Sequence, residues 1–208
     1  MKPICILAAA LSTLAISHAD LVISEIDMAN QKIEIINTGP GPENLTGYFL
    51  CNRLNGSPFY PAITTAMIVS ASSSTTTLAL PAGGILTLQA PAGFTPQGSG
   101  EVGLYTNNSF GSSASLLDYV GWGADGVRDS VAAAKGIWGL GTFVSVTGIQ
   151  PGQTIQLGQG LAGNAFTDYS LAASTIGTNQ VYPSPVATTD AVSGISDTGA
   201  TLNGLVNA

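Results

Sequence analysis

The 208-residue sequence predicts an all-β protein, folded as an antiparallel sandwich or barrel. Apolar and polar residues alternate with period two in short segments such as residues 32–35, which is the signature of half-buried strands. Glycine- and proline-rich turns, such as residues 81–84 and 151–152, separate these segments. Hydrophobic residues make up 45% of the chain, which is enough for a core and argues against disorder.

Residues 1–19 predict a secretory signal peptide. Lys2 supplies the short positive region, residues 4–16 are apolar, and Ser17 and Ala19 are small residues suited to cleavage before Asp20. The apolar stretch is too short for a permanent membrane span, so we expect no membrane insertion after cleavage. The sequence therefore predicts an exported protein, extracellular or on the cell surface, with the periplasm as an alternative.

Cleavage would leave four basic and twelve acidic residues, no histidine and one cysteine, Cys51. The charge of −8 argues against nucleic acid or an anionic membrane as a partner. Without histidine, no Ser-His-Asp or Cys-His catalytic site and no histidine-ligated metal can form. We expect Cys51 to be a small buried hydrophobe, with an interchain disulfide as the alternative. Lys32 and Lys135 are expected to be ordinary solvated lysines, and an isopeptide bond from Lys32 is the alternative.

In the first half of the chain, short runs rich in Val, Ile, Leu and Thr are bounded by turn residues, which is typical of strands. These runs lie at residues 21–26, 32–35, 48–51, 66–70, 76–80 and 85–89. The Ser/Thr-rich residues 70–77 and the Gly/Pro-rich residues 94–100 are expected to form surface loops.

The second half continues the pattern with one interruption. Strands are expected at residues 102–106, 116–122, 142–146, 154–157 and 167–171. The alanine-rich residues 130–135 predict the one helix, with Ser130 as its N-cap. Pro183 and Pro185 favour extended backbone, so residues 181–189 are expected to be a linker. Residues 190–208 are strand-like and too short to bury a core of their own.

Five segments, taken in order, resemble the motifs of lamin-tail domains. They are LVISEI at residues 21–26, IEIINTG at 33–39, NLTGYFL at 44–50, LPAGGILTL at 80–88 and LLDYVGWG at 116–123. The resemblance implies a non-enzymatic, immunoglobulin-like antiparallel β-sandwich over residues 20–180, of the kind found in exported bacterial multidomain proteins. Residues 190–208 are similar to the start of bacterial fibronectin type III repeats, which implies an incomplete second β domain.

Two tryptophans flank the one acidic cluster and form the candidate ligand site. Tyr119, Trp122 and Trp138 would stack a sugar ring, and Asp125 and Asp129 would bind its hydroxyls or calcium. The alternative is that the rings pack in the core and Asp125 belongs to a turn. The spacing of Asp125 and Asp129 does not match a calcium loop, so no cofactor is predicted.

We therefore expect a non-enzymatic exported or cell-surface module for protein interaction or spacing within a larger protein. The partner would be an unidentified protein or polysaccharide. The alternative hypothesis is a carbohydrate-binding accessory module of an extracellular enzyme. An exposed sheet edge would offer either module a route to a partner strand.

Overall fold

The computed structural model describes residues 21–54 and 59–178, and beyond them the backbone pairing of four short strands. The signal peptide expected at residues 1–19 lies outside the described residues. Strands dominate, all the named pairings are antiparallel, and the described residues contain a single α-helix. The all-β prediction is confirmed.

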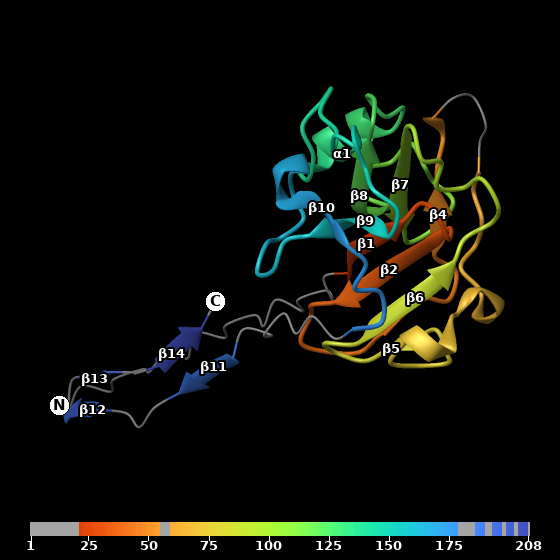
Figure 1. Ribbon diagram of the computed structural model, residues 1–208. Helices are drawn as coiled ribbons and strands as arrows, with labels where there is room; N and C mark the ends of the chain where they lie inside the picture. Colours follow the sequence, from red (N-terminus) through yellow and green to blue (C-terminus); the bar gives the residue numbers. More distant parts are fainter. Residues whose placement is uncertain are drawn as a thin grey trace.

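The larger sheet has five strands in the order β10-β9-β1-β2-β6 (Figure 1). β1 (Leu21–Asp27) and β2 (Lys32–Asn37) form a hairpin, and β6 (Ile85–Gln89) pairs with the far side of β2. β9 (Gln153–Leu157) joins β1 through only two residue pairs and continues the sheet to β10 (Tyr169–Ala173). A β-bulge between Ile23 and Glu25 shifts the register of β1 against β2. Beyond the bulge, the side chains of β1 therefore alternate between the two faces in the opposite phase.

The smaller sheet has three strands in the order β4-β7-β8. These are β4 (Phe49–Cys51), β7 (Gly100–Tyr105) and β8 (Leu116–Trp122), and β3 (Glu43–Asn44) pairs separately with β5 (Ala79–Leu80). β8 lies against β1 of the larger sheet. Between the sheets lies one continuous core, which includes Ile23, Ile33, Ile35, Leu86, Leu104, Val120 and Trp122. The fold is an antiparallel β-sandwich.

The helix α1 (Asp129–Lys135) follows β8. Its N-cap position is Arg128, which makes no side-chain cap bond, so the prediction that Ser130 caps the helix is wrong. The buried carboxylate of Asp129 lies in the first turn, where a negative charge complements the helix dipole. Gly136 ends the helix in the left-handed conformation at φ 83°.

Four expected strands are shorter or replaced. Residues 65–72 form two 3-10 turns, η2 (Thr65–Met67) and η3 (Ser70–Ser72), with a single bridge from Ile68 to Leu88 between them. Of residues 142–146, only Val144 bridges, in parallel, to Trp122. β5 keeps two residues of 76–80, and η4 (Phe166–Asp168) precedes β10 where a strand was expected to begin.

Irregular segments cover the outer edges of β6 and β4 and the end of β8. Residues 68–74 line the outer edge of β6, where Val69 and Ser74 donate backbone bonds to Thr87 and Ile85. Residues 59–63 cover β4, and Val144 covers the end of β8. The covered stretches of β6 and β4 leave little free backbone for the addition of a partner strand.

The four strands near the C-terminus pair among themselves. β11 (Val186–Thr189) pairs with β14 (Gly204–Asn207), and β12 (Ser193–Ser196) pairs with β13 (Gly199–Thr201). The range expected to be a linker, residues 181–189, therefore contains β11 at its end.

Candidate functional site

The three aromatic residues expected to form a ligand platform lie in the core. Tyr119 and Trp122 are fully buried and Trp138 is 4% exposed. Tyr119 and Trp138 pack edge to face, with their ring centroids 5.3 Å apart. The indole Nε1 of Trp122 donates to Pro96 O, and that of Trp138 donates to Thr142 O. No ring offers a face to solvent, so an exposed stacking platform is not built from them.

The two carboxylates of that candidate site, Asp125 and Asp129, differ in exposure and in contacts. Asp125 is exposed, whereas Asp129 is buried and its Oδ2 accepts a bond of 3.0 Å from Gly141 N. Asp129 therefore fastens the loop after α1 to the helix. Among the residues that the structure describes, no three Asp, Glu, His or Cys side chains are grouped to hold a metal ion.

Glu101, a fully buried residue of β7, organises the neighbourhood of Tyr119. Its Oε1 accepts from Arg53 N at 3.0 Å, and its Oε2 accepts from Arg128 N at 2.9 Å and from the Tyr119 hydroxyl at 3.0 Å. Burial and the adjacent Glu101 charge raise the pKa of Tyr119 far above its ordinary value. Glu101 thus ties the chain after β4 and the start of α1 to the smaller sheet.

Asp118 joins the two sheets. Its Oδ2 accepts from Ile23 N of β1 at 2.6 Å, and its Oδ1 accepts from Tyr119 N at 2.8 Å. The Ile23 carbonyl accepts from the Tyr169 hydroxyl at 3.0 Å. β9 pairs with β1 only at Glu25 and Ile26, so it gives Ile23 no hydrogen-bond partner. The side chains of Asp118 and Tyr169 bind the Ile23 N–H and carbonyl instead. Burial raises the pKa of Asp118 to about 7.

On the outer face of the larger sheet, two buried glutamates hold the segment that follows β10. We call residues 174–178 the strap. Glu25 accepts bonds from the Ser174 hydroxyl at 2.8 Å, the Thr175 hydroxyl at 2.6 Å and Thr175 N at 3.1 Å. Glu34, its cross-strand neighbour, accepts from Gly177 N at 2.8 Å. Burial, and to a lesser degree the Glu25 charge, raises the pKa of Glu34.

The strap also packs against η3. A Cβ on Gly177 would lie 2.5 Å from the Ser72 Cβ, so the strap approaches η3 more closely than any other residue type would permit. Gly177 also has a φ of 79°, which only glycine adopts readily. The strap therefore crosses the outer face from β10 to η3.

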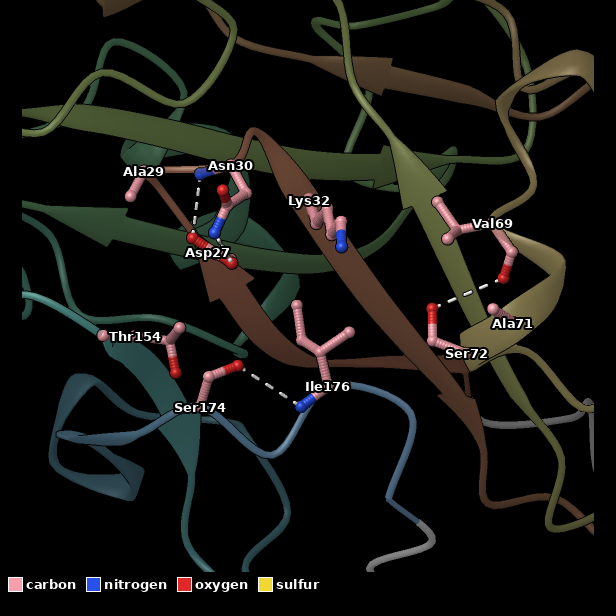
Figure 2. A pocket seen from close by; sticks show the side chains of 11 residues that line it. Asp27, Ala29, Asn30, Lys32, Val69, Ala71, Ser72, Thr154, Ser174 and Ile176 are labelled. Carbon is pink, nitrogen blue, oxygen red and sulfur yellow. Dashed lines mark hydrogen bonds between the residues drawn. The ribbon is translucent and has the colours of Figure 1, made fainter.

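A hollow of about 350 Å³ lies beside the strap on the same face. Its lining comes from the β1–β2 hairpin, from residues 69–72, and from β9 and the strap. Figure 2 shows Lys32 between the Asp27–Asn30 turn and the side chains of Val69 and Ser72, with Ile176 extending toward it from the strap.

Cys51 is a free, fully buried thiol, as the core interpretation expected. Burial raises its pKa to about 11, so the thiol stays protonated and poorly nucleophilic at neutral pH.

The glutamates of the sheets were the residues that sequence reasoning missed. Glu25, Glu34 and Glu101 each interrupt an apolar strand, and a carboxylate among such residues signals a buried acceptor. The sequence does not reveal the partners, because the strap is about 150 positions from Glu25.

Comparisons with protein-family models, with curated proteins and with solved structures found no match. In the part of the chain that the structure describes, no helix is long and apolar enough to cross a membrane.

Proposed function

We propose that the chain is a non-enzymatic, exported β-sandwich module of lamin-tail type, with an immunoglobulin-like topology, that spaces or links other parts of a larger extracellular or cell-surface protein. The observation that carries this proposal is the strap. A spacer must pass tension between its sandwich and the chain that follows it, and the strap is the segment through which that tension would enter.

The strap supports the proposal by its geometry. Tension applied beyond residue 178 would load the bonds from Gly177 to Glu34 and from Thr175 to Glu25 before it reached β10. Both acceptors are buried, so water cannot readily replace the strap as their partner. Several hydrogen bonds loaded together resist separation better than a terminal strand that opens one bond at a time.

The use of the acidic side chains also supports a structural role. Glu25, Glu34, Glu101, Asp118 and Asp129 are buried and accept bonds from backbone N–H groups or hydroxyls that connect distant segments. Their removal is expected to affect stability in each case.

Single-molecule stretching of the full chain between marker domains tests the spacer role. We expect a first extension event from strap release, at a force that Thr175→Ala lowers because it removes a hydroxyl bond to Glu25 without altering the sheet. Asp125→Asn, on the exposed loop before α1, serves as the matched control. An unchanged force in Thr175→Ala would contradict the mechanical role proposed for the strap.

Export is tested separately by the intact mass of the protein recovered from outside the cytoplasm. A mass that lacks residues 1–19 is expected. Recovery of the uncleaved chain in the cytoplasm would contradict the proposed location.

A further inference from the structure

We propose that the hollow beside the strap binds a neutral saccharide unit, with Lys32 as its principal donor. The spacer role does not require this site, so the two proposals can fail independently. The proposal rests on the composition of the lining, on the ammonium group of Lys32, for which the described residues offer no acceptor, and on the volume of the hollow.

The charges of the lining cancel. Of its residues only Asp27 and Lys32 are charged, and they are cross-strand partners on β1 and β2. The nearby carboxylates of Glu25 and Glu34 lie beneath the strap and further disfavour an anion. An uncharged ligand with many hydroxyls avoids both repulsions, and the −7 charge of the whole chain disfavours an acidic polymer in the same way.

The hydrogen-bonding groups are mixed, as polyol recognition requires. Among the described residues, none accepts a bond from Lys32 Nζ, and an ammonium group carries three N–H donors. Asp27 can only accept, and its two oxygens each take one bond from Asn30. The Ser72 hydroxyl donates to Val69 O, and the Ser174 hydroxyl donates to Glu25 and accepts from Ile176 N. Each hydroxyl oxygen has two lone pairs, so each can still accept a bond from a ligand. A sugar hydroxyl likewise donates and accepts, so adjacent hydroxyls of one ring can bridge Lys32 and Asp27.

The shape and the walls fit one ring. A volume of about 350 Å³ is at the small end of ligand pockets and holds a single hexose or pentose. Val69 and Ile176 both line the hollow and add apolar surface suited to the C–H face of a sugar (Figure 2). The aromatic platform expected from the sequence is buried elsewhere, so this site is distinct from it.

The test is an NMR titration of the full chain with the methyl glycosides of glucose, galactose, mannose and xylose. We expect saturable shifts for at least one glycoside, with a dissociation constant of about 1 mM, confined to amides around Lys32, Ser72 and Ser174. Lys32→Gln is expected to weaken binding about tenfold, because it removes a charged donor.

Two further variants keep the test decisive. Lys135→Gln, at an exposed position on α1, removes the same charge away from the hollow and should bind like the parent. Ala71→Phe, at an exposed lining position, should block the hollow and abolish the shifts while the protein stays folded. The proposal is overturned if no glycoside gives saturable shifts, if Lys135→Gln weakens binding as much as Lys32→Gln, or if Ala71→Phe binds normally.

Discussion

The buried carboxylate of Asp118 gives the sandwich a pH dependence of known sign. Its pKa rises from an ordinary 3.8 to about 7 in the folded protein, because burial disfavours the charged form. Between these values the folded state binds more protons than the unfolded state, so this residue's contribution to stability falls as pH rises through about 7. The Ile23 and Tyr119 N–H bonds oppose the shift but do not cancel it.

Asp118→Asn is expected to lower the free energy of unfolding. The amide NH₂ of the variant must face one of the two N–H groups, of Ile23 and Tyr119, that donate hydrogen bonds to Asp118 in the parent. The loss should be about 1–3 kcal/mol at acidic pH. It should shrink by pH 8, where the parent must hold a buried charge and the variant does not. Urea unfolding of both proteins from pH 4 to pH 8 measures the difference, in which the other carboxylates cancel. A loss that grows with pH would contradict the raised pKa.

The amide variant of Glu101 should also destabilise the smaller sheet. Glu101→Gln sets an NH₂ group against the Arg128 N–H or the Arg53 N–H, and leaves a buried donor without an acceptor. We expect a loss of about 2 kcal/mol and a lower Tm by about 4–8 °C. Asp125→Asn, at an exposed position, should stay within about 0.5 kcal/mol of the parent. Thermal unfolding followed by circular dichroism checks both variants, and equal melting temperatures would refute the assigned role of Glu101.

At the scale of elements, the Ser/Thr-rich segment beside β6 acts as an edge cap. The Ser73 hydroxyl accepts from Thr87 N at 2.9 Å and donates to Val69 O at 2.9 Å, and the Ser74 hydroxyl accepts from Ile85 N. Side-chain hydroxyls thus replace the ladder that a neighbouring strand would supply. The cap protects the sheet edge from pairing with another chain.

Ser73→Ala is expected to reduce the free energy of unfolding by about 1–3 kcal/mol, since it leaves the buried Thr87 N–H without an acceptor. It should also promote self-association through the uncovered edge of β6. Ser70→Ala, at an exposed position of η3, is the matched control and should behave like the parent. Chemical unfolding and sedimentation velocity measure the two effects. Parent-like stability in Ser73→Ala would show that the hydroxyl does not cap the edge.

The local sequence pattern predicted the bounds of those strands that pair with other strands. The predicted bounds of β6 and β8 match the structure, because each is a short, largely buried run that is bounded by turn residues and pairs with a neighbouring strand. Residues 66–70 are as apolar as a strand, but the segment forms two 3-10 turns, and at the second turn the Ser72 and Ser73 hydroxyls donate to Val69 O. Residues 142–146 contribute one bridge because Trp138 and Gly139 occupy the bonds of Thr142.

The candidate site was less predictable than the fold. Composition cannot separate a tryptophan that stacks a ligand from one that fills a core, and burial decided against the platform of Trp122 and Trp138. The strap and the hollow depend on contacts between β1, β2 and residues 69–72 and 174–177, which are distant in sequence. Such tertiary contacts carry no local sequence signal.

At the scale of the whole molecule, repulsion between acidic groups should dominate the electrostatics. The sequence has twelve acidic and five basic residues. The buried carboxylates accept hydrogen bonds from neutral donors such as Thr175 N and Gly177 N. Salt should therefore stabilise the protein. Raising NaCl from about 0.02 M to about 0.5 M shortens the Debye length from about 20 Å to about 4 Å, and the Tm should rise by a few degrees.

Lys135→Gln tests the repulsion directly, because it removes a positive charge at an exposed position on α1 and so makes the net charge more negative by one. The variant should melt below the parent in dilute buffer, and the gap should narrow as salt is added, since screening weakens the added repulsion. Scanning calorimetry of both proteins across the salt series measures the two slopes. A Tm that falls with NaCl in the parent would mean that attractive pairs outweigh repulsion, and the charge imbalance would then not govern stability.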